Sequence, residues 1–180
     1  MSDVKNEHED KRTLKEDIFY PDHVRTESPT FRATKLAGHK ANKCCMISGH
    51  TEKVEYHHSF CEYAFMLGVD WTIVKGVATG TITDLPKLDL HTDQPTSETF
   101  AAKDSMLWLL CKMAEIRGFD WSTFDPAKPE EFVDCMAHMW PLHEKFHRAT
   151  GHGIHMETFP VWSFQALPRI AGFIYTADEE

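Results

Sequence analysis

A histidine-rich stretch near the carboxyl end constrains this chain more than any other feature. It runs Trp140-Pro141-Leu142-His143-Glu144-Lys145-Phe146-His147-Arg148-Ala149-Thr150-Gly151-His152-Gly153-Ile154-His155. Imidazole nitrogens are preferred ligands of several divalent transition metals, so histidines gathered this closely predict a metal site. The stretch can be interpreted in two ways, and the choice between them decides the function.

Length and composition predict one globular domain. The chain has 180 residues, of which 42% are hydrophobic and 12% aromatic, enough to bury one core with appended arms. No apolar run approaches the roughly 20 residues that span a bilayer, and the amino-terminal residues lack the apolar centre of a secretion signal. We therefore expect no membrane contact and a cytoplasmic location. The cysteines are odd in number and irregularly spaced, which indicates reduced thiols.

The charge is acidic in total but unevenly distributed. A formal net charge of -9 argues against a protein that coats nucleic acid by bulk electrostatics. Residues 31–43 nevertheless contain several basic side chains and no acidic one. The basic stretch is either a solvated segment or, in a nuclease, a phosphate-contacting arm. Its candidate DNA-binding residues are Arg32, Lys35, Lys40 and Lys43.

Local patterns predict both strands and helices. Residues 1–30 are polar and form an expected arm with one short helix near residues 14–19, followed by a turn at Ser28-Pro29. Residues 43–47 and 54–57 flank a Gly-containing turn and predict a β-hairpin. The spacing of apolar residues predicts a core helix over residues 97–118, and helical spacing also marks residues 59–67. Pro129 introduces a helix over residues 130–139, and Pro141 is expected to start a new helix that carries His143 and His147.

The first interpretation of the histidine stretch is a zinc protease helix. His143-Glu144-x-x-His147 matches the pattern in which two histidines on one helix face bind zinc and the glutamate activates water. Against it, Lys145 and Arg148 are charged within a helix that is normally apolar, and the positions of the extended protease pattern hold Thr150 and Gly153.

The second interpretation joins the stretch to distant residues. Three segments carry it: Cys45-Met46-Ile47-Ser48-Gly49, then Val54-Glu55-Tyr56-His57-His58, then Met139-Trp140-Pro141-Leu142 leading to His147. The tail Gly153-Ile154-His155-x-x-Thr158-Phe159-Pro160-x-Trp162 continues them. Together they resemble the HNH (ββα-metal, or His-Me finger) endonucleases, and among these the phage-type members. The resemblance covers roughly residues 43–60 and 134–165.

The resemblance implies an α+β fold: a ββα-metal, treble-clef-like finger with an inserted helical layer. The finger lies in a single domain over residues 31–180, and the insertion occupies about residues 60–134. The family's central asparagine, which braces the loop that carries the base, aligns with His138. A histidine there can still bind a backbone group, but the substitution can also mark a lost activity. Asp134, just before the proposed finger helix, is a candidate to orient a ligand histidine.

By the same resemblance, His57 binds a divalent cation and His58 acts on water as the general base. Adjacent strand residues point to opposite sides, so the two roles require the strand to end or twist there. His147 completes the metal site, with His152 or His155 reaching it from the turn that follows. The expected cofactor is one Mg²⁺, Mn²⁺, Ni²⁺ or Zn²⁺ ion. Too few cysteines remain for a four-cysteine structural zinc.

Three functions remain open from the sequence. The first is a metal-dependent DNA endonuclease encoded by a phage or prophage, with His58 and His138 in catalytic positions. The second is a catalytically inactive scaffold that retains the finger and binds DNA or a phage or host protein; the acidic balance and His138 favour it. The third is the zinc metalloprotease.

Overall fold

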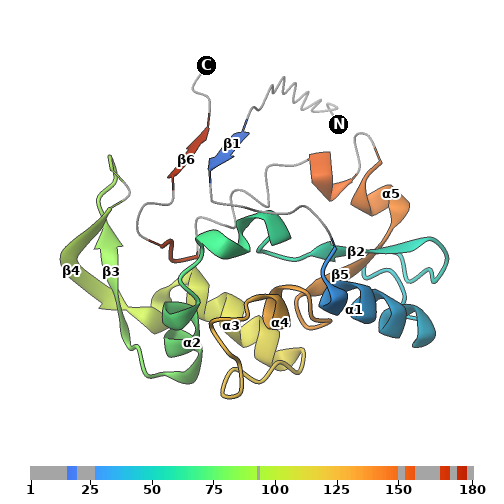
Figure 1. The fold of residues 1–180 in the computed structure, drawn as a ribbon, viewed down its shortest axis with the longest axis horizontal. Coiled ribbons are helices and arrows are strands. Elements are labelled where there is room, and N and C mark those ends of the chain that lie inside the picture. The colour runs from blue at the N-terminus through green and yellow to red at the C-terminus, as the bar shows by residue number, and fades with distance from the viewer. Residues whose placement is uncertain are drawn as a thin grey trace, which may run out of the picture.

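The chain has an α+β fold of small antiparallel ribbons and short helices, seen in a computed structural model (Figure 1). The structure describes residues 16–19, 27–92, 94–149, 153–156, 167–170 and 174–177. In this part of the chain the strands pair as β1 (Glu16–Phe19) with β6 (Ile174–Ala177), β2 (Val54–His58) with β5 (Met139–His143), and β3 (Asp84–Leu88) with β4 (Pro95–Ala101). The described residues include no helix that is long and apolar enough to cross a membrane.

The ribbon of β2 and β5 joins the two segments that the sequence analysis placed in one site. Its antiparallel register sets Val54 opposite His143 and His58 opposite Met139. The predicted hairpin was therefore wrong, because β2 pairs with β5 and not with residues 43–47. That segment forms a turn in which Cys45 N donates to His50 O at 2.7 Å and Met46 N donates to Pro141 O at 2.9 Å. The turn is thus attached to β5.

Pro141 lies inside β5, so the prediction that it starts a helix was also wrong. Its fixed φ suits an extended strand, and its missing N–H is tolerated at a sheet edge, which a two-stranded ribbon offers on both sides. Helix α5 (Glu144–His147) begins only after His143, whose Nδ1 accepts the Lys145 N–H at 3.1 Å as an N-cap.

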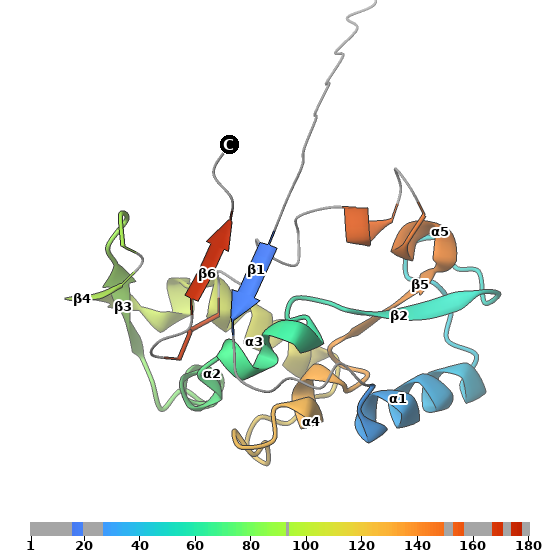
Figure 2. The same cartoon turned by 45° about the horizontal axis from the view of Figure 1, so that its top comes forward.

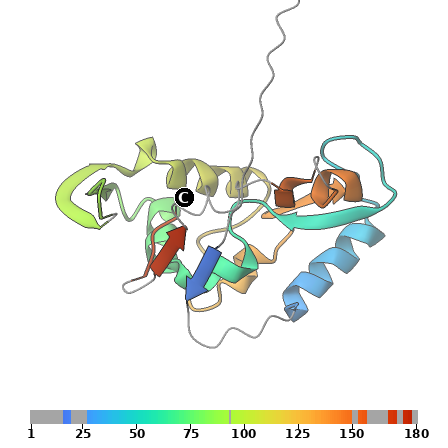
Figure 3. The same ribbon diagram turned by 90° about the horizontal axis from the view of Figure 1, so that it is seen from above.

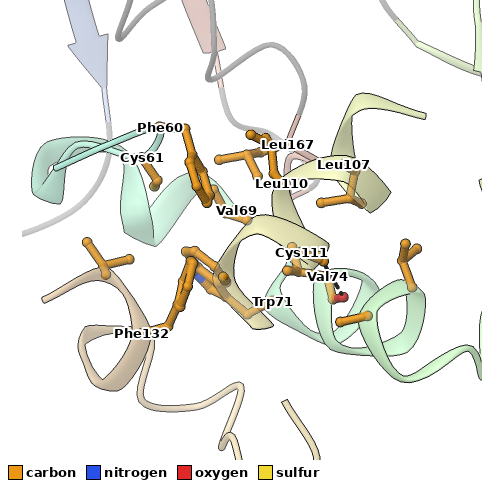
Figure 4. Packing of buried hydrophobic residues seen from close by; sticks show 14 of the residues in the cluster. Phe60, Cys61, Val69, Trp71, Val74, Leu107, Leu110, Cys111, Phe132 and Leu167 are labelled. Atoms are coloured by element: carbon orange, nitrogen blue, oxygen red, sulfur yellow. Dashed lines mark hydrogen bonds between the residues drawn. The ribbon is translucent and has the colours of Figure 1, made fainter. Parts of the chain in front are cut away.

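The residues between β2 and β5 form the main hydrophobic core. They include η1 (Tyr63–Gly68), α2 (Trp71–Thr79), η2 (Ala102–Asp104), α3 (Met106–Ile116) and α4 (Glu130–Val133). Phe132 lies at the centre, with its ring 4.6 Å from that of Trp121 and 5.8 Å from that of Trp71. Figure 4 shows Trp71 and Phe132 packed beneath Phe60 and Val69, with Leu110 and Cys111 alongside.

The predicted helices in this region are shorter than expected. The core helix begins at Met106, where Ser105 accepts the Trp108 N–H, because residues 95–101 form β4 instead. The helix expected over residues 130–139 ends at Val133, and residues 59–67 contain only a 3₁₀ helix. At residues 95–101, pairing with β3 overrides the local helix periodicity.

The amino-terminal region differs from the prediction as well. Residues 16–19 are a strand and not part of a helix, while residues 14 and 15 lie outside the described part. The basic stretch is largely helical, in α1 (Pro29–Lys40). Ser28 and Pro29, interpreted as a turn, are its N-cap and first residue, since Ser28 Oγ accepts the Phe31 N–H at 2.9 Å.

The two helices beside the central ribbon lie on opposite faces of it. Figures 1 and 2 show α5 above the β2–β5 ribbon and α1 below it, with β3 and β4 at the far end of the molecule. Seen from above in Figure 3, the β1–β6 ribbon stands apart from β2. The β2–β5 ribbon is therefore the element whose two faces must be compared.

Candidate metal centre

The alternation of β2 separates its two histidines. His57 faces α5, where its ring lies 5.4 Å from that of His147. His58 faces α1, where it stacks on Phe31 with the ring centroids 5.1 Å apart and the planes 20° from parallel. The strand ends at His58 without a twist that would turn both side chains to the same side. His57 and His58 therefore lie on opposite faces of β2.

Three of the predicted metal ligands meet on the α5 face. His57 comes from β2, His147 from α5, and His155 from η3 (Ile154–Met156). One ring nitrogen of each lies within 4.8 Å of the others, and the Nε2 atoms of His147 and His155 are 3.0 Å apart. This group could bind one metal ion. His152, the fourth predicted ligand, lies outside the described residues.

The electrostatics of these rings favour metal binding. His57 is 1% exposed, and burial lowers its pKa to about 4. Burial also lowers the pKa of His155. Both imidazoles are therefore neutral at pH 7, the state that a metal requires. Within the described part of the chain, His57 Nε2 is buried without a hydrogen-bond partner.

Glu55 orients one of the ligands, a role that the sequence analysis did not assign. Its Oε2 lies 2.7 Å from His147 Nδ1, and its Oε1 accepts from Arg148 Nη2 at 2.6 Å. A carboxylate on one imidazole nitrogen directs the other nitrogen to the metal and raises its basicity. Strand alternation was the available signal, since Glu55 and His57 share a face.

His58 is held by carboxylates. Its Nε2 lies 2.8 Å from Oδ1 of the fully buried Asp134, which also accepts from Ser28 Oγ, and its Nδ1 lies 3.5 Å from Glu62 Oε2. Burial opposes charge on this ring, but Asp134 and Glu62 outweigh it and raise the pKa of His58. Asp134 thus orients the candidate base, whereas the sequence suggested that it would orient a metal ligand.

His138 is a brace in the interior. Its Nδ1 donates to Val133 O at 2.7 Å, and its Nε2 accepts the Cys61 N–H at 3.2 Å, just beyond the end of β2. It is fully buried, and burial holds its pKa well below the ordinary value. The neutral ring therefore bonds the loop after His58 through the backbone and does not reach the surface.

Glu62 follows the end of β2 and faces both histidines of the strand. Its Oε1 lies 3.6 Å from His57 Nδ1, while its Oε2 faces His58. Burial raises the pKa of Glu62, but His58 and His57 outweigh this, and the net shift is downward. The sequence alone does not indicate this role, because no periodicity places residue 62 beside residues 57 and 58.

The basic residues lie on or just after α1, next to His58 through Phe31. Arg32, Lys40 and Lys43 are exposed. Lys35 is half-buried, paired with Glu27 at 2.6 Å and placed over the Phe31 ring at 4.7 Å. Three of the four predicted DNA contacts are thus available on the surface, and the fourth is engaged within the protein.

The protease pattern is not assembled in the described residues. His143 caps α5, and Glu144 pairs with Lys53 at 2.6 Å, while the group of possible metal ligands contains neither. All of the cysteines are free thiols, and none belongs to that group.

No family model, curated protein or solved structure matched this chain. The function is therefore inferred from the geometry of the site.

Proposed function

We propose that this protein is a metal-dependent DNA endonuclease of the HNH (ββα-metal) type. The observation that carries the proposal is the convergence of His57, His147 and His155 from β2, α5 and η3. The order of elements supports it, because β2, β5 and α5 follow one another as strand, strand and helix with the insertion between the strands. The orphaned His57 Nε2 fits a ligand nitrogen that a cation satisfies.

The donor set indicates which cations to test. Three imidazoles favour Zn²⁺, Ni²⁺ and related transition metals, whereas Mg²⁺ prefers oxygen ligands. When bound, the cation supplies charge stabilisation at the scissile phosphate. His57, His147 and His155 hold it, and Glu55 keeps the His147 ring in position.

His58 is the proposed general base. Asp134 holds its Nε2, so Nδ1 is the nitrogen that takes a proton from water as the water oxygen attacks phosphorus. One P–O ester bond breaks, and a proton returns to the leaving oxygen. Asp134 orients His58, and His58 is the base. His138 anchors the loop that follows His58.

Helix α1 supports contact with the DNA backbone. It packs on His58 through Phe31 and carries Arg32 and Lys40 on its exposed surface, with Lys43 following. These cations provide local phosphate contacts in a protein that is acidic as a whole.

The test is nicking of supercoiled plasmid with Mg²⁺, Mn²⁺, Ni²⁺ or Zn²⁺. We expect cleavage with the transition metals that is lost in His58→Ala and His147→Ala and retained in Glu144→Ala and in the exposed control His91→Ala. Cleavage of casein that depends on Glu144 would instead establish a protease.

A non-catalytic scaffold is the second candidate. The net charge of -9 and the internal pairing of Lys35 with Glu27 favour a scaffold whose partner is a protein, since both reduce affinity for a polyanion. Tight binding of DNA or a protein, without cleavage under any of the metals, is the result that supports the scaffold.

A further inference from the structure

Buried polar atoms without hydrogen-bond partners gather at the end of β2. Among the described residues these atoms are Tyr56 OH, His57 Nε2, Ser59 Oγ and Glu62 Oε1. Such atoms are costly in a folded protein and are expected where a ligand satisfies them. His57 and Glu62 lie against each other, so their orphaned atoms have a common explanation.

The position of Glu62 determines which nitrogen of His57 is free. Its Oε1 lies 3.6 Å from His57 Nδ1, which is longer than a hydrogen bond by about 0.5 Å. The negative charge of this carboxylate favours the tautomer with the proton on Nδ1, which leaves the Nε2 lone pair available. The orphaned Nε2 is therefore the atom of His57 that is free to bind a cation.

The same carboxylate reaches the other face of the strand. Glu62 Oε2 lies 3.5 Å from His58 Nδ1, the nitrogen that Asp134 leaves unoccupied. Glu62 is thus in contact with both histidines that β2 directs to opposite sides. Glu55 makes the equivalent contact with His147 but does not contact His58 in the hydrogen bonds and ion pairs of the described residues.

We propose that Glu62 is a positioning residue shared by the two halves of the site. Its Oε1 favours the proton on His57 Nδ1, so that Nε2 binds the cation, and its Oε2 faces His58 Nδ1, where it stabilises the proton that this base takes from water. The inference rests on the proposed metal-dependent function. It adds one residue that contacts the histidines on both faces of β2. Glu62 acts through the two histidines and not on the substrate.

The experiment measures Zn²⁺ affinity of the full-length protein by competition with a chromophoric chelator. The variants are Glu62→Gln, Glu62→Asp and the matched control Glu52→Gln, whose side chain is 78% exposed in the same region of the chain. We expect Glu62→Gln to weaken Zn²⁺ binding by about 10–100-fold, as other partners of ligand histidines do. Glu62→Asp should recover part of the loss, and Glu52→Gln should bind as the unaltered protein does.

Two further readouts separate positioning from stability. The melting temperature without metal should change little in Glu62→Gln, because glutamine keeps the size of the side chain and both contacts of Glu62 are longer than a hydrogen bond. The visible spectrum of the Co²⁺ complex should change, because the His57 ring is no longer held. If Glu62→Gln does not fold, Glu62→Asp carries the test, with an intermediate loss of affinity expected.

The outcomes distinguish the inference from the function. Unchanged Zn²⁺ affinity in Glu62→Gln overturns the inference and leaves the three-histidine centre intact. A loss that merely follows a lower melting temperature, without recovery in Glu62→Asp, also overturns it. If the unaltered protein binds Zn²⁺ with an affinity that depends on Glu62 but does not nick plasmid, the result supports the inference and contradicts the nuclease. Absence of Zn²⁺ binding by the unaltered protein overturns both.

Discussion

The inserted core and the β2–β5 ribbon differ in whether their buried polar groups have hydrogen-bond partners. In the core, both buried indoles are satisfied, since Trp71 Nε1 donates to Met66 O at 2.7 Å and Trp121 Nε1 donates to Cys111 O at 3.1 Å. The ribbon has a small apolar cluster and contains the orphaned atoms of Tyr56 and His57. Stability is therefore concentrated in the insertion, and the cost of burying polar atoms without partners falls on the ribbon.

The two regions are mechanically connected. Arg117, directly after α3, donates to Met136 O and Met139 O on either side of the His138 brace. His138 in turn binds the loop after β2. The insertion thus supports the strand ends that carry the histidines, and the contrast between the regions can be tested by substitutions in each.

The largest effect is expected in the core. Phe132→Ala removes a ring that is 1% exposed and contacts several other aromatic rings, so the free energy of unfolding should fall by about 3–5 kcal/mol. Chemical denaturation without metal measures it. Leu90→Ala, at a side chain that is 92% exposed, is the control and should change little. A loss below about 1.5 kcal/mol would contradict the assignment of stability to the insertion.

The next-largest effect is expected on the cleavage rate and not on metal affinity. Asp134→Asn removes the carboxylate that orients His58, so the cleavage rate should fall by about 100-fold, the scale of general base catalysis. Zn²⁺ affinity should remain unchanged, because the hydrogen bonds and ion pairs of the described residues join Asp134 to none of the three ligands His57, His147 and His155. Equal losses of affinity and rate would show that the two faces of β2 are not separate.

The third effect is a dependence of stability on pH. Burial keeps His138 neutral in the folded state, whereas the unfolded chain binds a proton near pH 6.5. The stabilisation is complete above pH 6.5 and is lost as the pH falls below it, by up to about 1.4 kcal/mol per pH unit. Comparison of unfolding between pH 7 and 5 in the unaltered protein and in His138→Asn should show a smaller slope in the variant. Equal slopes would exclude His138 as the source.

The smallest effect is expected at an orphaned atom in the ribbon. Tyr56→Phe removes a buried hydroxyl that has no partner among the described residues and lies against Gly38. The free energy of unfolding should change by less than about 0.5 kcal/mol or rise, because no hydrogen bond is lost. A clear loss in chemical denaturation would show that the hydroxyl is satisfied in solution.

Part of the site could be predicted from residue types and order. His57, His147 and His155 were candidates because of what imidazole binds, and the structure brings them together. Glu55 and Glu62 were missed, since their roles depend on the faces and ends of a strand whose partner was unknown. Helix α1 was missed although Ser28-Pro29 is a capping signal, because the turn interpretation uses the same two residues.

The sequence by itself determined the chemistry that this chain can offer: imidazoles for a cation, a basic stretch, and an α+β fold with a core large enough for one domain. Only the tertiary structure decided that β2 pairs with β5, that Pro141 extends a strand, and that His57 and His58 face different helices. The physical reason is that residue chemistry is local. Strand pairing across residues 59–138 instead depends on the summed packing of the insertion, which no short pattern contains.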